Sequence, residues 1–433
     1  MRAAFYECES TPPLGGFMWG HYQKILATGV LDRLYIKAGV FEENGNYAAI
    51  VTADTCSLVP GIHKIVTDRI AEYTPIPPEC VCISSNHSHS GAPISSDPSC
   101  EGKADEAYLS VFLRLLADAV ILAYQRLEDT EATFAISQVN GISFNRDFIT
   151  TSGKLVTHGR KRTDIVAPLD GIDPDLPVLF FRQQGKPIGA IINFACHQCC
   201  LGSYGEGYSG DYSSVLSRHL KEQYGHDFVS LFVLGACGDI NHVNPDPTIP
   251  IPKDHYRHMG KVLADAVISS MERAESVPGG VAAIYGEVTI RRRSVERDAV
   301  VAQVNTWLAD GGNLMRNRNL LHYQATHDHV ESDTLPVQAL RIGDVLISIL
   351  PGEVFNAYGK YIKANSGYTR NMVVENCNEY CGYIPTLKAF APESDLYETS
   401  LCRHSCLIPE AGTILSDKVL ELAAKLDKQE AVQ

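Results

Sequence analysis

Apolar, strand-like runs alternate along this chain with stretches of helical periodicity, and this alternation limits the possible fold more than any other feature. Four runs have the apolar, often β-branched content of strands covered on both faces: Val81–Ser84, Ile188–Ala195, Phe228–Gly235 and Met372–Val374. Apolar residues recur at helical spacing in Asp105–Leu127, Ser213–Tyr224, Tyr256–Met271, Val354–Ile362 and Pro409–Leu426. The pattern predicts a mixed α/β fold.

A tight connection between two further runs predicts a β-hairpin. Val337–Ile342 and Val345–Leu350 are separated only by Gly343-Asp344, and a two-residue turn that contains glycine is typical of antiparallel strands. We therefore expect at least one antiparallel pair beside the helix-linked strands.

Two long stretches follow neither pattern and are expected to be loops. They cover 141–177 and 241–255, and loops of this length in a compact domain are often functional. No internal repeat or low-complexity linker divides the sequence. We therefore expect a single, sandwich-like mixed α/β domain over residues 1–433.

The charge balance excludes one large class of function. The chain has 51 Asp and Glu against 37 Lys and Arg, a formal net charge of −14. Nucleic-acid binders need clustered basic side chains to neutralise phosphates. The only basic runs, Arg160-Lys161-Arg162 and Arg291-Arg292-Arg293, are short and lack interleaved aromatic residues, so we expect no nucleic-acid partner.

Composition also bears on solubility and location. Apolar residues make up 45% and charged residues 20% of the chain, which is ordinary for a globular protein. No window approaches the roughly 20 uninterrupted apolar residues of a membrane span, and no signal-type apolar run follows Met1. We expect a soluble, cytoplasmic protein without a membrane span. The sequence predicts nothing about the oligomeric state.

The cysteines point to the same compartment. There are 13 of them, and an odd number without a secretion signal favours free thiols over a disulfide framework. Cys196, Cys199 and Cys200 form one cluster that could bind metal. A single C-x-x-C is a weak zinc signal, because the second half of a structural site is not evident elsewhere.

Polar side chains follow four of the apolar runs at the point where each run ends. His87 and His89 come after the first run, His197 after the second, Asp239 after the third, and Glu353 after the hairpin. Ligands of open α/β sheets bind outside the carboxyl ends of the strands. These side chains are therefore expected to lie close together, and two or three histidines with one carboxylate suit a catalytic zinc ion.

Each of these residues also has a structural interpretation that the sequence leaves open. His87 and His89 could lie on a polar surface loop, and His197 could be a hydrogen-bonded core histidine. Glu353 could stabilise a helix N-terminus. Asp239 could accept hydrogen bonds from backbone amides in a turn, and Asp211 is typical of a helix N-cap.

An ordered series of short motifs resembles the neutral/alkaline (non-lysosomal) ceramidase family, specifically its N-terminal catalytic domain. The motifs, in chain order, are Thr11-Pro12-Pro13-Leu14-Gly15, His87-Ser88-His89-Ser90-Gly91, Asn145-Arg146, Phe194-Ala195-Cys196-His197, Ser209-Gly210-Asp211, Gly238-Asp239, Pro351-Gly352-Glu353-Val354, and Asn378-Glu379-Tyr380-Cys381-Gly382-Tyr383 followed by Tyr397-Glu398. The resemblance covers nearly the whole chain and implies one ceramidase-like catalytic domain.

The resemblance also implies a set of site residues. It places a zinc ion on His87, His197, Glu353 and Tyr383. It further implies that His89 transfers a proton or orients the substrate, that Arg146 binds an anion or a carbonyl, and that Tyr383 takes part in catalysis.

The chain departs from the family pattern at two places. Where the family reads G-D-x-S, this chain ends the motif with Asn241, and an asparagine can hydrogen-bond a substrate but cannot attack a carbonyl. Ala92 also separates Gly91 from Pro93 in the H-x-H-S-G-P stretch. We therefore expect Asn241 and Arg146 to bind a substrate other than ceramide.

The sequence hypothesis is a zinc-dependent hydrolase that cleaves an amide or ester bond of a polar small molecule. Two alternatives remain open. One is a metal-dependent lyase acting on an oxygen-rich, sugar-acid type of substrate, in which Tyr383 or His89 removes a proton. The other is a non-catalytic, zinc-dependent binding protein.

Overall fold

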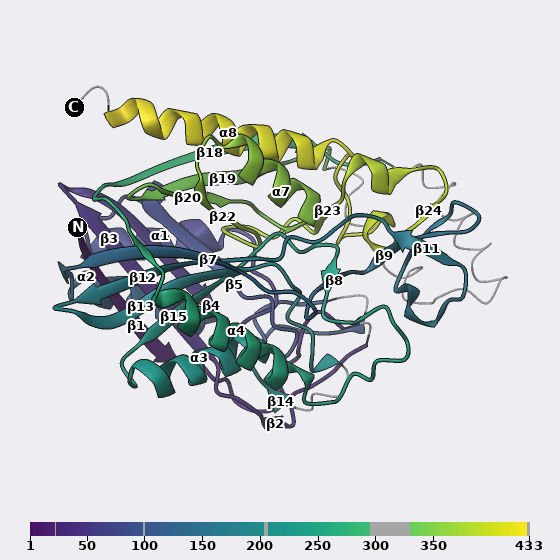
Figure 1. Ribbon diagram of the computed structural model, residues 1–433, viewed down its shortest axis with the longest axis horizontal. Coiled ribbons are helices and arrows are strands. Elements are labelled where there is room, and N and C mark those ends of the chain that lie inside the picture. Colours follow the sequence, from purple (N-terminus) through teal and green to yellow (C-terminus); the bar gives the residue numbers. More distant parts are fainter. Residues whose placement is uncertain (22, 98–99, 203–206, 295–329, 431–433) are drawn as a thin grey trace.

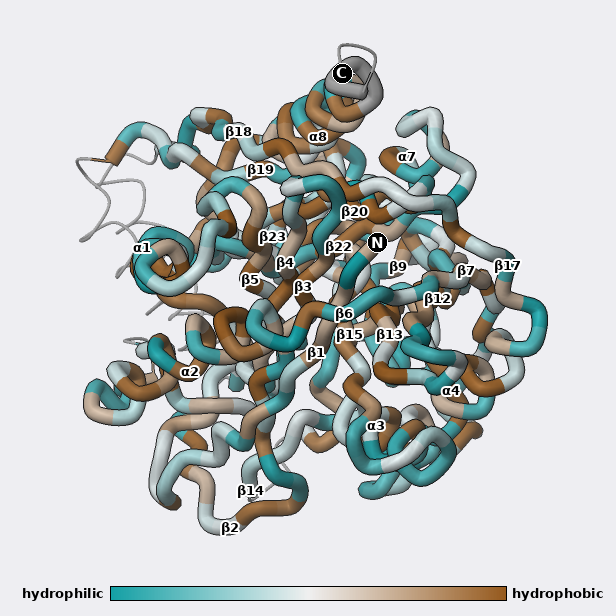
Figure 2. Tube along the Cα trace, turned by 90° about the vertical axis from the view of Figure 1, so that its left-hand side faces the viewer, coloured by the Kyte–Doolittle hydropathy of each residue, from teal (hydrophilic) through white to brown (hydrophobic). Residues whose placement is uncertain are grey.

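Three β-sheets meet at the centre of the molecule, and pairs of helices surround them (Figure 2). The computed structural model describes residues 1–21, 23–97, 100–202, 207–294 and 330–430. The first sheet has the order β5-β4-β3-β1-β6, the second β15-β13-β12-β7-β17 and the third β18-β19-β20-β22. The mixed α/β prediction is confirmed.

The strands of the three sheets have the following bounds. The first sheet contains β1 (Arg2–Glu9), β3 (Tyr35–Glu43), β4 (Asn46–Ala53), β5 (Val81–Ser85) and β6 (Glu128–Asp129). The second contains β7 (Glu131–Gln138), β12 (Asp175–Gln183), β13 (Lys186–Phe194), β15 (Val229–Leu234) and β17 (Glu275–Ser276). The third contains β18 (Val281–Arg291), β19 (Ser332–Ile342), β20 (Val345–Ile349) and β22 (Arg370–Val374).

Each sheet packs one face against helices. Buried side chains join the first sheet to α1 (Ile62–Tyr73) and α2 (Glu106–Tyr124). They join the second sheet to α3 (Asp211–Tyr224) and α4 (His255–Met271), and the third to α7 (Asn356–Asn365) and α8 (Ala411–Glu430). Figure 1 shows α8 lying along β18 and α7, with α3 and α4 on the opposite side of the sheets.

The other faces of the sheets share a second layer of core. Phe5 and Phe41 from the first sheet meet Phe181 from the second, with ring centroids 4.9–5.8 Å apart. Residues of the third sheet such as Ile347 belong to the same buried cluster. Aromatic pairs at these distances contribute packing beyond their buried area, so the three sheets hold one another in place.

One helix-linked parallel pair occurs in each sheet. The pairs are β4–β5 across α1, β13–β15 across α3 and β20–β22 across α7. Parallel strands end at the same edge of their sheet. Each sheet therefore presents the carboxyl ends of two strands to a common region.

The predicted strands and the hairpin are confirmed, with boundaries shifted by one or a few residues. β19 and β20 are antiparallel, and Gly343 in their turn has φ +62°, a conformation that glycine adopts without strain. The expected helix from Val354 begins two residues later, because Val354 belongs to the short strand β21 (Glu353–Val354), which pairs with β23 (Tyr383–Ile384).

The stretch 141–177 is more regular than predicted. It contains β8 (Phe144–Asn145), β9 (Asp147–Thr150), β10 (Leu155–Thr157) and β11 (Ile165–Pro168), and β24 (Ser394–Asp395) completes a small sheet with the last three. Two further pairs join β8 to β16 (Ile240–Asn241) and β2 (Gly29–Val30) to β14 (Gly207–Tyr208). Strands of two to four residues are too short to produce a recognisable periodicity.

Among the described helices, α2 is long and apolar enough to cross a membrane by length and composition. Its Phe112 and Leu116 are fully buried in the core with the first sheet. Its Asp118 pairs with Arg69 of α1 at 2.8 Å. Core helices of globular domains have the same composition, so this property alone is weak evidence for a membrane span.

Candidate metal centre

Three side chains that follow strands of three different sheets meet at one point. His87 follows β5, His197 follows β13 and Glu353 follows β20. Glu353 Oε2 lies 3.0 Å from His197 Nε2 and 3.4 Å from His87 Nε2, and the three ligand atoms lie within 4.8 Å of one another. We call these three residues the metal cluster. The expected convergence of strand ends is therefore observed.

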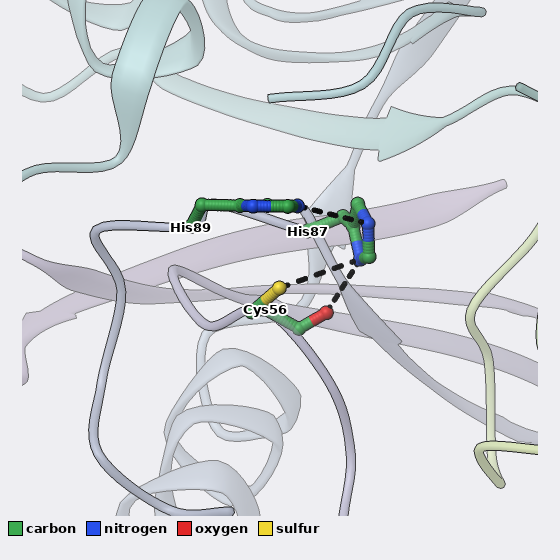
Figure 3. Close-up of side chains that lie close together, drawn as sticks. All are labelled: Cys56, His87 and His89. Carbon is green, nitrogen blue, oxygen red and sulfur yellow. Dashed lines mark hydrogen bonds between the residues drawn. The ribbon is translucent and has the colours of Figure 1, made fainter. Parts of the chain in front are cut away.

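Backbone carbonyls fix the orientation of both cluster histidines. His87 Nδ1 donates to the carbonyl of Cys56 at 2.7 Å, and Figure 3 shows this contact. His197 Nδ1 donates to the carbonyls of Cys237 at 2.8 Å and Ile240 at 3.1 Å. A carbonyl only accepts, so each ring carries a hydrogen on Nδ1, and in the neutral form of each ring the Nε2 lone pair faces the cluster.

The arrangement fits a zinc ion. Tetrahedral ligands at zinc distances of about 2.0–2.1 Å are separated by roughly 3.3 Å from one another, close to the two separations measured from Glu353. Two neutral imidazole nitrogens and one carboxylate are also a known catalytic zinc donor set. The residues present therefore suit a zinc ion that keeps at least one further position open.

The cluster places ionisable side chains in a buried environment, where a charge without a partner is costly. All three side chains are at most 1% exposed. Burial alone would raise the pKa of Glu353, but His87 and His197 beside it hold the pKa well below its ordinary value. Burial and the nearby Arg146 lower the pKa of His197 to about 4. An anionic carboxylate facing a neutral imidazole in a buried site is the environment in which a divalent cation is favoured.

The backbone at His87 is strained. Its φ is +64°, which is uncommon for a residue with a Cβ and is concentrated at functional sites. Asn86 holds the turn in place: its amide donates to Asp54 Oδ1 at 2.6 Å, and its Oδ1 accepts from the Ser88 N–H at 3.1 Å. The backbone therefore turns at His87.

His89 lies beside the cluster, next to His87. Its Nε2 is 3.4 Å from His87 Nε2, as Figure 3 shows, and its carbonyl contacts His21 Nε2 at 2.9 Å. Burial, followed by the neighbouring His87 and His21, holds the pKa of His89 well below its ordinary value. A neutral imidazole in this position can accept a proton.

Two tyrosines occupy the region where the sequence placed one. The hydroxyl that reaches the cluster belongs to Tyr380, which donates to Glu353 Oε1 at 2.8 Å. Tyr383 is the backbone partner of Glu353 in the β21–β23 pair, and its ring centroid lies 5.4 Å from the guanidinium carbon of Arg146. The structure thus brings Tyr380 to the carboxylate and Tyr383 to the arginine.

Arg146 is buried beside the cluster and held by an acidic partner. Its Nη1 lies 3.5 Å from His197 Nε2, and its Nη2 donates to the carbonyl of Gly238 at 2.8 Å. Its Nε lies 2.6 Å from Glu398 Oε1. Glu398 is fully buried and is the acidic residue of the Tyr397-Glu398 motif. The motif therefore supplies the counter-ion of Arg146.

Asn241 and Asp239 make contacts within the protein. Asn241 Oδ1 accepts from the N–H of Val243 at 3.2 Å, and Asn241 Nδ2 contacts Cys199 Sγ at 3.6 Å. Asp239 accepts from the N–H of Asn356 at the start of α7 and from the side chain of Asn145, both at 2.7 Å. The Asp239 carboxylate therefore has a structural role, with partners distant in sequence rather than the turn amides expected for it. A substrate contact of Asn241 stays a prediction.

Asp211 is the first residue of α3 rather than its N-cap, and the cap position is Gly210. Its carboxylate accepts from the N–H groups of Tyr212 at 2.7 Å and Leu201 at 3.2 Å. The side chain therefore joins the helix start to the loop after β13. This role is close to the predicted one, shifted by one residue.

The cysteine cluster is separate from the metal cluster. All 13 cysteines are free thiols. Cys199 Sγ contacts His242 Nδ1 at 3.8 Å, and Cys200 Sγ contacts Met259 Sδ at 3.2 Å. Burial raises the pKa of Cys199 to about 12. Within the described residues, the groups suited to metal binding include Cys56 but none of the C-x-x-C cysteines.

Sequence reasoning missed one buried acid that supports the cluster. Glu375 follows β22, is fully buried, and accepts from the N–H of Val354 at 2.6 Å and from Cys237 Sγ at 3.1 Å. It therefore holds the strand that carries Glu353. The rule that a polar residue follows each apolar run applies to Glu375 as well and could have identified it.

Comparison with known proteins identifies the fold. No family model matches the chain, and no curated protein sequence matches it. The crystal structure of neutral ceramidase from Pseudomonas aeruginosa matches with a TM-score of 0.77 and 19% identity, over 99% of this chain and 74% of that one. The fold is ceramidase-like. A structure of ceramidase complexed with C2 gives the same score and identity, over 99% and 75% of the two chains.

Proposed function

We propose that the protein is a zinc-dependent hydrolase that cleaves an amide or ester bond of a polar small molecule. The observation that carries the proposal is the metal cluster, in which His87, His197 and Glu353 arrive from three sheets and direct their ligand atoms at one point. Zinc in such a site polarises a carbonyl and lowers the pKa of water. The ceramidase-like fold supports the same class of reaction.

Tyr380 is the better-placed fourth ligand. Its hydroxyl already contacts Glu353, whereas Tyr383 stacks beside Arg146. We therefore assign Tyr380 to the metal and leave Tyr383 as a side chain that holds Arg146 and contacts the substrate.

The remaining residues have distinct roles in this proposal. Arg146 lies next to His197 and would stabilise negative charge that develops on the carbonyl oxygen. His89 lies next to His87 and would take up the proton that the attacking water loses and pass it to the leaving group. Because Asn241 replaces the expected serine, water would attack the carbonyl directly, without an acyl-enzyme.

Hydrolysis in ¹⁸O-labelled water tests the proposal. The zinc-loaded protein is incubated with a panel of polar N-acyl compounds and esters, and the products are analysed by mass spectrometry. We expect one ¹⁸O atom in the released acid, loss of turnover in Glu353→Gln, and unchanged turnover in Glu393→Gln, which alters an exposed carboxylate.

Two results would contradict the proposal. An unsaturated product that absorbs in the ultraviolet and carries no label would indicate a lyase. Tight retention of an unaltered compound, with no turnover of any member of the panel, would indicate a binding protein.

A further inference from the structure

Three consecutive hydrogen bonds connect the surface to the metal cluster. Arg403 Nε donates to His404 Nε2 at 3.0 Å. His404 Nδ1 lies 3.4 Å from the hydroxyl of Tyr380, and that hydroxyl donates to Glu353 Oε1 at 2.8 Å. The chain therefore runs from a partly exposed arginine to a residue of the metal cluster.

The chemistry of the groups gives this chain a direction. A guanidinium can only donate, so His404 Nε2 accepts from Arg403 and a neutral His404 carries its hydrogen on Nδ1. Nδ1 then donates to the oxygen of Tyr380, and the phenolic hydrogen is left for Glu353. Asp97 Oδ2 lies 3.7 Å from the same Nε2, a longer contact than the 3.0 Å contact from Arg403 Nε.

Packing holds the two central rings in this arrangement. The ring of Trp19 meets the ring of Tyr380 edge-on at 5.3 Å and that of His404 edge-on at 5.2 Å. The backbone of His404 is also fixed, because its carbonyl accepts from the N–H of Tyr383 at 2.7 Å. A Cβ on Gly382 would lie 2.4 Å from that carbonyl, so only glycine allows this close approach.

The same residues line a pocket of about 490 Å³. Trp19, Tyr380, Arg403 and His404 contribute part of its wall, and apolar residues such as Leu109 contribute another part. Tyr380 therefore borders both this pocket and the metal cluster.

We propose that His404 is a positioning residue that aims the oxygen of Tyr380 at the metal cluster, and that Arg403 fixes the tautomer of His404 for this purpose. The inference rests on the proposed metal centre. Groups that orient a ligand in this way typically change metal affinity by about 10- to 100-fold when they are removed.

Zinc titration of the metal-free protein tests the inference without reference to turnover. His404→Phe keeps a ring against Trp19 but removes both nitrogens. His404→Asn restores an N–H donor near the position of Nδ1. His63→Phe is the matched control, because His63 is a partly buried histidine of α1 that stacks on Tyr285 and belongs neither to the metal cluster nor to the hydrogen-bonded chain.

We expect His404→Phe to weaken zinc binding about 10- to 100-fold, His404→Asn to recover most of the loss, and His63→Phe to bind zinc as the parent does. The inference is wrong if His404→Phe binds zinc as tightly as the parent, or if His404→Asn is as weak as His404→Phe. If His404→Phe does not fold, Arg403→Leu replaces it and is expected to weaken binding by a few-fold.

Failure of the proposed function gives a different result. A parent protein that binds no zinc overturns both the metal centre and the inference. A parent that binds zinc, with His404 variants of equal affinity, overturns the inference alone.

Discussion

At the scale of single residues, buried ionic groups determine how the site is held. Arg146 is 8% exposed and Glu398 is fully buried, and their contact at 2.6 Å links the arginine beside the cluster to the Tyr397-Glu398 motif. Removing one partner of a buried pair leaves the other charge without compensation. The position of Arg146 therefore depends on a residue more than 250 positions away in the sequence.

Glu398→Ala is expected to lower the free energy of unfolding by about 3–5 kcal/mol, because Arg146 would remain buried and unpaired. Denaturant unfolding measures the change. Glu393→Ala, which removes a nearby exposed carboxylate, is the control and is expected to have little effect. If Glu398→Ala lowered the free energy of unfolding no more than the control does, the Arg146–Glu398 pair would contribute nothing to stability.

His242 is expected to make stability depend on acidity. Burial, followed by the nearby His255 and His197, lowers the pKa of His242 from 6.5 to about 3 in the folded protein. The contribution of neutral His242 to the free energy of unfolding is fully present above about pH 6.5. Below that pH the unfolded chain binds a proton that the folded protein does not, so the free energy of unfolding falls by about 1.4 kcal/mol per pH unit until the pH approaches 3. Unfolding free energies of the metal-free parent should therefore fall more steeply over this range than those of His242→Gln. Parallel curves would contradict the prediction.

Some site residues were predictable from sequence and others were not. His87, His197 and Glu353 each lie within three residues of the end of an apolar run, so their convergence follows from strand direction alone. Tyr380 and Tyr383 lie three residues apart in an irregular segment. Only the pairing of Tyr383 with Glu353 in β21–β23 decides which hydroxyl reaches the cluster, and two-residue strands leave no sequence signal.

At the scale of elements, the site is built from one helix-linked parallel pair in each sheet. β5, β13 and β20 deliver the three residues of the metal cluster, and β15 and β22 deliver Asp239 and Glu375 beside them. The long apolar strands and the helices that connect them were predictable from the sequence, because their periodicity is strong. How the three sheets pack on one another could not be predicted, because many apolar faces are compatible with one another.

Asp239 links the start of α7 to β8, and its loss should weaken this link. It accepts hydrogen bonds from the start of α7 and from Asn145. Asp239→Ala should cost about 1–3 kcal/mol of unfolding free energy, because buried donors lose their acceptor. Asp239→Asn keeps one acceptor oxygen and should cost less. Equal losses in denaturant unfolding of the two variants would contradict this role.

At the scale of the whole molecule, a bound metal would join all three sheets. The strands that lead into the three cluster residues belong to three different sheets, and an ion that binds only the folded protein stabilises it by mass action. Free zinc at 100 times its dissociation constant is expected to raise the free energy of unfolding by about 2.7 kcal/mol.

The same measurement with Glu353→Gln provides the control for this linkage. The variant lacks the anionic ligand, so added zinc should leave its unfolding free energy nearly unchanged. A rise in the variant as large as that in the parent would show that zinc binds elsewhere in the molecule.

The central claim is that His87, His197 and Glu353 hold a single zinc ion, and the metal content of the purified protein tests it most directly. Elemental analysis is made on the parent, His197→Ala and Cys199→Ser after equal exposure to zinc and dialysis. We predict one zinc per chain in the parent and in Cys199→Ser, and almost none in His197→Ala. Zinc retained by His197→Ala, or lost from Cys199→Ser alone, would contradict the account.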